Sequence, residues 1–142
     1  FDLRQGREFL SLKDISVADL DVEVVQSVTE GMTGEDLVAH LRASHRTEAY
    51  VVNPQGTLTG VVPILSALSN PDKTASALIG TDYLVLNLGD DLQQALGIAR
   101  RFVGEAIPVV DEAGAIVGCL SEGAILGGTL DRQEEVKGRE RN

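Results

Sequence analysis

Three groups of residues in this sequence have types and spacings that could do chemistry: two histidines, two pairs of adjacent acids and one cysteine. His40 and His45 stand five positions apart on or just beyond one predicted helix, so they point to different faces and make a poor pair of metal ligands. Glu35-Asp36 and Asp90-Asp91 could act as acid and base, but each pair stands where a helix begins and negative charge is stabilising. The sequence therefore predicts no catalytic residue and no metal site.

The cysteine, Cys119, lies in an apolar run that predicts a buried strand. A single cysteine cannot form a disulfide within the chain, which fits a reducing compartment. We interpret Cys119 as a structural thiol, because reactive cysteines need a partly exposed, electropositive environment.

Charge and hydropathy exclude several classes of partner. The 142 residues carry a net charge of −10, whereas binding to nucleic acid requires clustered Lys and Arg. The sequence has neither a basic amphipathic stretch for anionic lipids nor an apolar run of ~18 residues that could span a membrane. We expect no nucleic-acid partner and no membrane insertion of these residues. The sequence starts at Phe1 without a signal-peptide pattern, so we expect it to be part of a longer chain.

An internal repeat predicts the elements that position these residues. The segment EAYVVNPQGTLTGVVPIL at 48–65 is matched by AIPVVDEAGAIVGCLSEG at 106–123. Each copy is an apolar run, a turn and a second apolar run, and Gly114 and Gly118 follow Gly56 and Gly60 at the same offset of 58. Such a repeat is a strong indication of architecture.

Around each hairpin the sequence predicts helix–strand–helix–strand–strand–helix, which gives an α+β fold. Because a unit of this size buries too little surface alone, we expect the two halves to pack sheet to sheet around a shared core. The predicted helices are a short one after Ser16, one after Thr33, and others at 64–68, 74–79, 90–103 and 121–126; the predicted strands besides the hairpins are 22–28 and 83–88. The predicted organisation is a linker at 1–15, repeats at 16–70 and 71–130, and a charged tail at 131–142.

The two halves resemble cystathionine-β-synthase (CBS) domains, which occur as tandem pairs called Bateman modules and would form a pseudo-twofold pair. The residues that carry this resemblance are Ala49–Asn53 with Gly56 and Gly60, and Ile107–Asp111 with Gly114, Gly118 and Ser121.

A second resemblance concerns the start of the sequence. Asp2–Glu8 and the following Ile15–Leu20 look like the join between the last membrane helix and the CBS pair in bacterial CLC-type chloride channels and transporters.

In this family adenosine nucleotides (ATP, ADP or AMP) can bind between the halves, at a Gly-hydrophobic-x-Thr/Ser-x-x-Asp motif. The first half has Pro63 and Ser66 at the hydroxyl and carboxylate positions, and the second has Ser121 and Ala124. Neither motif is complete and no Lys or Arg stands beside either, so we favour structural roles: an N-cap for Ser121, a turn former for Asp82 and packing for Tyr83. The ligand contacts that the resemblance implies are Thr81, Asp82, Tyr83, Glu105, Ile107, Pro108 and Ser121.

Two functions remain open. The first is a non-catalytic regulatory and dimerisation module on the cytoplasmic face of the cell membrane, attached to a CLC-type transport domain of the same chain. Apolar surfaces at 64–68 and 125–126 would then contribute to a homodimer. The alternative is an adenine-nucleotide-sensing CBS pair that regulates another attached enzyme or transporter.

Overall fold

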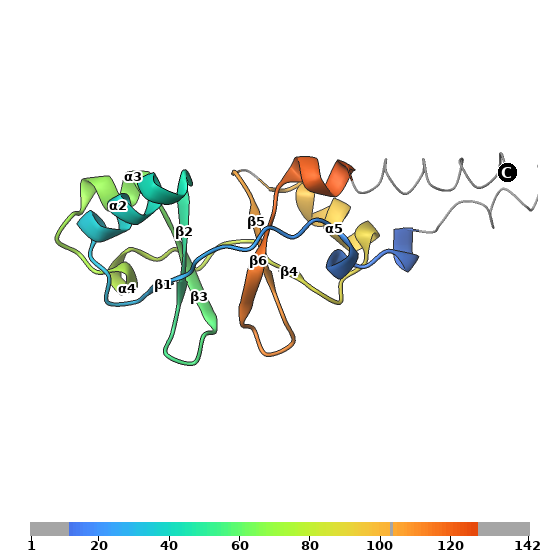
Figure 1. Cartoon of the computed structure of the whole chain (residues 1–142), viewed down its shortest axis with the longest axis horizontal. Coiled ribbons are helices and arrows are strands. Elements are labelled where there is room, and N and C mark those ends of the chain that lie inside the picture. Colours follow the sequence, from blue (N-terminus) through green and yellow to red (C-terminus); the bar gives the residue numbers. More distant parts are fainter. Residues whose placement is uncertain (1–11, 103, 128–142) are drawn as a thin grey trace, which may run out of the picture.

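The first half of the molecule is a three-stranded sheet covered by helices on one side. The computed structural model describes residues 12–102 and 104–127, and Figure 1 shows the two halves side by side. The sheet has the order β1-β2-β3, with β1 parallel and β3 antiparallel to β2. The elements are the 3-10 helices η1 (Leu12–Asp14) and η2 (Val17–Asp19), then β1 (Val28–Thr29), α2 (Gly34–Ser44), β2 (Glu48–Val52), β3 (Leu58–Pro63) and α3 (Ile64–Ser69).

The second half repeats this order. Its sheet is β4-β5-β6 with the same parallel and antiparallel pairings, and residues 122–127 form the final helix. The predicted α+β fold, with six elements in each repeat, is confirmed. The elements are α4 (Ala75–Leu78), β4 (Leu86–Asn87), α5 (Leu92–Ala99), β5 (Ile107–Val110) and β6 (Ile116–Leu120).

The two hairpins are the most closely repeated part of the structure. Ala49 pairs with Val62 in the first sheet as Ile107 pairs with Leu120 in the second, and both ladders shift register one residue before the turn. In the turns, the side-chain oxygens of Asn53 and Asp111 each accept two backbone N–H bonds of 2.9–3.0 Å. Gly56 and Gly114 close the turns at φ values of 85° and 84°, which L-residues with a side chain disfavour.

The two repeats exchange their leading segments. Val17, from the first repeat, donates its N–H to Asp90 and is fully buried in the core of the second sheet. Ala75, from the second repeat, donates its N–H to Met32 and is fully buried in the core of the first sheet. Residue 16 was predicted to begin the first repeat, whereas apolar residues between 12 and 22 pack with the core of the second half.

The two sheets face each other across a small interface cluster. Leu58 and Val61 from β3 lie there with Val110 and Cys119 from β5 and β6. The backbone also connects the halves, because the N–H of Leu58 donates to the carbonyl of Gly114 at 3.0 Å. Sheet-to-sheet packing is therefore confirmed. None of the helices in the described ranges is long and apolar enough to cross a membrane.

Several elements are shorter than predicted. The helix predicted over 90–103 begins at Leu92, because Asp91 caps it, and its last turn tightens where Arg101 and Phe102 bond to carbonyls three residues back. The strand predicted over 22–28 covers only Val28–Thr29, because Glu23 instead forms an isolated bridge with the other half. The tail at 131–142 and most of the linker at 1–15 lie outside the described residues.

Candidate functional site

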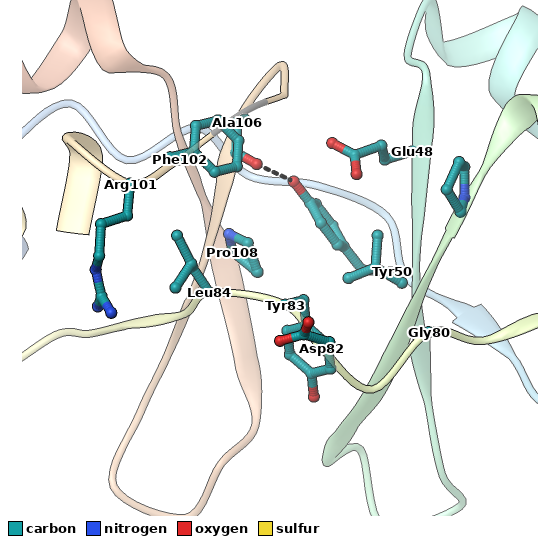
Figure 2. Close-up of a pocket in the computed structure, with 12 residues that line it drawn as sticks. Glu48, Tyr50, Gly80, Asp82, Tyr83, Leu84, Arg101, Phe102, Ala106 and Pro108 are labelled. Atoms are coloured by element: carbon teal, nitrogen blue, oxygen red, sulfur yellow. Dashed lines mark hydrogen bonds between the residues drawn. The ribbon is translucent and has the colours of Figure 1, made fainter.

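A cleft of about 400 Å³ lies between the two sheets and is open on one side. Figure 2 shows labelled side chains of both repeats converging on it, with the first repeat on the right. Its volume falls within the range of about 300–1,000 Å³ that small-molecule sites occupy. The lining residues are Glu48, Tyr50, Val61 and Pro63 from the first sheet, Gly80, Asp82, Tyr83 and Leu84 from the segment before β4, and Arg101, Phe102, Ala106 and Pro108.

Tyr50 joins the two halves at the inner end of the cleft. Its hydroxyl donates to the carbonyl of Ala106 at 3.3 Å, as the dashed line in Figure 2 shows. Burial raises the pKa of Tyr50 well above its ordinary value, so the phenol stays protonated and remains a donor. The ring therefore fixes the separation of the sheets where a ligand would lie.

Three charged side chains line the cleft. Glu48 is half-buried, and burial is the main cause that raises the pKa of its carboxyl, with the charge of Glu105 acting in the same direction. Asp82 lies beside Tyr83 on the segment before β4, and Arg101 reaches the cleft from the turn after α5. The cleft thus combines aromatic rings with two carboxylates and one guanidinium.

The predicted ligand contacts separate into two groups. Asp82, Tyr83 and Pro108 line the cleft, and Thr81 lies exposed between two lining residues. Ile107 is fully buried in the core of the second half, because neighbouring strand residues face opposite sides of the sheet.

Glu105 and Ser121 interact within the protein. The carboxylate of Glu105 accepts a hydrogen bond from the hydroxyl of Thr47 at 3.3 Å and lies 3.8 Å from the guanidinium of Arg46. The hydroxyl of Ser121 accepts the N–H of Ala124 at 3.0 Å, which confirms its role as the cap of the final helix.

Sequence reasoning missed four charged or aromatic residues of the cleft: Glu48, Tyr50, Arg101 and Phe102. Phe102 stands near the end of the helix predicted over 90–103, and it packs against the core of the second half while also lining the cleft. Of these four residues, Arg101 departs most from the prediction, because the sequence analysis found no cation beside either motif. It stands far from both motifs in the sequence, and only the packing of α5 brings it to the cleft.

The first-half motif lines this cleft through Pro63, which offers neither a hydroxyl nor an N–H to a phosphate. Ser66, at the carboxylate position, uses its backbone carbonyl to accept the side-chain amide of Asn70 at 2.9 Å. Any anion or hydroxyl group in the cleft would therefore have to bind to Arg101 and Asp82 in place of the motif.

On the side of the pair that is pseudo-equivalent to this cleft, Cys119 takes the place of Val61; this side is called the second cleft below, and the side chain of Arg46 lies there. Its guanidinium lies 2.8 Å from the carboxylate of Glu23 and donates to the Cys119 sulfur at 3.3 Å. Burial raises the pKa of the Cys119 thiol, and the Arg46 charge opposes this shift. Cys119 is 1% exposed on β6, which confirms its predicted burial.

The other candidate residues have structural positions. Asp91 accepts the N–H of Gln94 at 2.8 Å as the cap of α5, and Glu35-Asp36 form the first turn of α2. His45 is the C-cap of α2 in the left-handed conformation, one turn beyond His40. Within residues 12–102 and 104–127, no group of three or more His, Cys, Asp or Glu side chains could hold a metal ion.

Comparison with known proteins agrees with this architecture. Residues 75–129 match the family model of the CBS domain. The chain is 27% identical over 117 residues to a homoserine O-acetyltransferase of Methanohalophilus mahii, covering 80% of this chain and 24% of that protein. The chain therefore spans about a quarter of the length of this relative.

Solved structures extend the likeness to both halves. The cytosolic domain of the Mg²⁺ channel MgtE in complex with ATP superposes with a TM-score of 0.72 and 24% identity, covering 89% of this chain and 55% of that one. CBSX2 in complex with AMP gives a TM-score of 0.71 and 20% identity, covering 82% of this chain and 97% of that one. The described chain therefore has the fold of a CBS-domain pair, and its second half matches the CBS-domain family.

Proposed function

We propose that this chain is a non-catalytic regulatory module that binds an adenine nucleotide in the cleft lined by Tyr83 and Arg101. The observation that carries the proposal is this cleft of about 400 Å³, to which both repeats contribute aromatic and charged side chains. An adenine ring can stack on the aromatic side chains, a carboxylate accepts ribose hydroxyls, and a guanidinium binds phosphate oxygens. Two structures of the same fold are complexes with ATP and AMP, which supports this ligand class.

The net charge of the cleft favours a nucleotide with few phosphates. Arg101 is opposed by Glu48 and Asp82, and the chain as a whole carries −10. Each further phosphate adds negative charge that these groups repel. We therefore expect AMP to bind more tightly than ATP in the absence of Mg²⁺.

Thermal unfolding in the presence of AMP, ADP and ATP tests the proposal. At about 100 times Kd, a ligand stabilises by about 2.7 kcal/mol, which raises Tm by about 5–10 °C for a chain of this length. Asp82→Ala and Arg101→Ala should reduce the shift, whereas Asp72→Ala and Arg100→Ala, at exposed residues that do not line the cleft, should retain it. The absence of any shift at millimolar nucleotide, with and without Mg²⁺, would refute nucleotide binding.

A second candidate function is dimerisation, which exposed leucines on the outer helices favour. Leu65 and Leu68 on α3 are 72% and 48% exposed, and Leu126 in the final helix is 47% exposed. Leu68 also borders a groove of about 310 Å³ together with residues of α2. Exposed apolar side chains that lie together on one helix face, as those of Leu65 and Leu68 do, are typical of interaction surfaces.

Sedimentation of the wild type and single variants tests this candidate. Leu65→Glu and Leu126→Glu should shift the chain toward monomer, because each places a charge in the expected contact. Val24→Glu is the matched control, since Val24 is 83% exposed and lies outside these helices. A wild type that stays monomeric at all accessible concentrations would exclude the homodimer.

The attachment to a CLC-type transport domain, and the location at the cytoplasmic face of the membrane, are part of this second candidate. The residues at 2–8 that carry this resemblance lie outside the described part of the chain. Two of the structural relatives are the cytosolic domain of the Mg²⁺ channel MgtE and the soluble part of a magnesium transporter. Sequencing the gene upstream of Phe1 tests the attachment. A series of apolar spans there would support a transport domain, whereas a catalytic domain there would contradict the attachment to a transporter.

A further inference from the structure

Arg46 occupies the space that is equivalent to the open cleft. The open cleft is bordered by Val61, whose strand forms a backbone bridge with Gly80. In the other half Cys119 takes the place of Val61, and it forms the equivalent backbone bridge with Glu23. Because Arg46 contacts both Glu23 and Cys119, its guanidinium lies in the second cleft.

The contacts of Arg46 hold it in this position. One terminal nitrogen lies 2.8 Å from the Glu23 carboxylate, and the other donates to the Cys119 sulfur and lies 3.8 Å from Glu105. The Arg46 side chain is only 16% exposed, which is low for an arginine. Three partners from different segments therefore enclose one guanidinium.

The open cleft has no such side chain at the equivalent position. Gly104 follows Arg46 by the repeat offset, and a Cβ atom there would lie 2.9 Å from the Phe102 ring and 3.1 Å from the Glu48 carboxylate. The first cleft is open, whereas Arg46 lies in the second, and the repeat position of Arg46 holds a glycine in the other half.

We propose that Arg46 is an internal plug that closes the second cleft and limits the pair to one nucleotide. This inference rests on the proposed function, since it takes the clefts as nucleotide-binding surfaces. A nucleotide entering the second cleft has to displace the guanidinium, which leaves the carboxylates of Glu23 and Glu105 facing its phosphate. Removal of the Arg46 side chain opens the cleft and exposes Cys119.

The reactivity of Cys119 tests the plug without any nucleotide, because this is the only cysteine in the chain. In Arg46→Ala, the rate of reaction with the aromatic disulfide dithionitrobenzoate should rise about tenfold. This factor corresponds to a free energy of local opening that is lower by about 1.4 kcal/mol. Electrostatics alone predicts the opposite, because the Arg46 charge lowers the pKa of the thiol and its loss leaves less reactive thiolate. An unchanged or slower rate therefore overturns the proposal.

Two further variants serve as controls. Arg100→Ala removes an exposed arginine outside the second cleft and should leave the rate unchanged. Glu23→Gln weakens the plug from the outside, and because Glu23 is 71% exposed the substitution does not threaten folding. Because the Glu23 charge also raises the pKa of the Cys119 thiol, the rates are compared per thiolate, from the pH dependence of the reaction. The rate per thiolate should increase by a smaller factor, so the proposal stays testable if Arg46→Ala fails to fold.

Calorimetric titration with AMP provides the second measurement. We expect one site per chain in the wild type and one additional site in Arg46→Ala. The wild-type value tests the proposed function, and the difference between the two proteins tests the plug. No binding to the wild type with one site in the variant would refute the first cleft and support the plug, whereas equal numbers of sites overturn the plug.

Discussion

The two clefts of this pair are built from equivalent strands, yet one holds a cavity of about 400 Å³ and the other holds Arg46. The hairpins that flank them keep the same register, the same turn hydrogen bonds and the same positive φ. The scaffold is thus symmetric, and the loop before each central strand is not. A duplicated fold can therefore retain its architecture while single positions decide which of its two sites stays open.

The same asymmetry extends to the strands. Tyr50 in β2 bridges the sheets, whereas Pro108 at the equivalent position of β5 has no hydroxyl to do so. Glu48 brings a carboxylate to the first cleft, whereas its equivalent Ala106 is apolar and buried. Each difference can be tested by a substitution at one member of the pair.

On strand β5, Ile107 belongs to the core and Pro108 lines the cleft, so substitutions at these two positions should affect different quantities. Ile107→Ala should lower the free energy of unfolding by about 2–5 kcal/mol, because it removes a fully buried side chain. The affinity of the folded protein for AMP should stay unchanged. Pro108→Ala is the control on the opposite face of the strand, and it should change affinity more than stability. Urea unfolding and calorimetry measure the two quantities, and weaker AMP binding by folded Ile107→Ala would place Ile107 in the site.

The sequence predicted the hairpins well because their turns depend on short-range chemistry. Asn53 and Asp111 accept bonds from residues two and four positions on, and the glycines at the turns supply the required φ. The leading segments could not be assigned in this way. Ile15 and Val17 are apolar residues that could fill either core, and only long-range packing places them in the second half.

The difference between short-range and long-range contacts also explains why the candidate site was predicted only in part. Asp82, Tyr83 and Pro108 follow from the resemblance, which implies ligand contacts at the entry to the first strand of the second repeat and on its central strand. Arg101 and Arg46 do not, because their place depends on where the ends of α5 and α2 lie relative to the opposite sheet. A long side chain such as that of arginine can reach a site distant from its own backbone, so the residues next to it in the sequence do not indicate that it belongs to the site.

The next prediction tests the symmetry of the hairpins. Gly56→Ala and Gly114→Ala should each cost about 1–2 kcal/mol of stability, because a side chain disfavours φ near 85°. The cost should be larger at Gly114, where the new Cβ would lie 3.2 Å from Thr57, than at Gly56, which faces open space. Gly97→Ala in α5 is the control and should stabilise the protein, since alanine favours helix. Equal stability of the wild type and both turn variants would contradict the strained turns.

Removal of the Tyr50 hydroxyl tests the bridge that exists on only one side. Tyr50→Phe should lower the free energy of unfolding by about 0.5–1.5 kcal/mol, because the carbonyl of Ala106 loses a buried hydrogen bond. Tyr83→Phe is the matched control in the same cleft and should have a smaller effect, since Tyr83 is less buried. Chemical unfolding of the two variants measures the difference, and equal losses would mean that the bridge contributes nothing.

The smallest effect concerns the carboxylate that only the first cleft has. The pKa of Glu48 is raised in the folded protein, so between its ordinary and its raised value the folded state binds more protons than the unfolded state. Its contribution to stability is therefore present at low pH and is lost as the pH rises through the raised pKa. Glu48→Gln removes this loss, so the variant should gain stability relative to the wild type as the pH rises above the ordinary pKa of glutamate, about 4.3.

Urea unfolding across this pH range measures the gain, with Glu112→Gln in the second hairpin turn as the exposed control. The control should follow the wild-type profile. Parallel profiles for Glu48→Gln and the wild type would show that the half-buried carboxylate is well solvated. The same result would remove one of the two repulsive charges on which the expected preference for AMP over ATP depends, because a solvated carboxylate is screened from the phosphates.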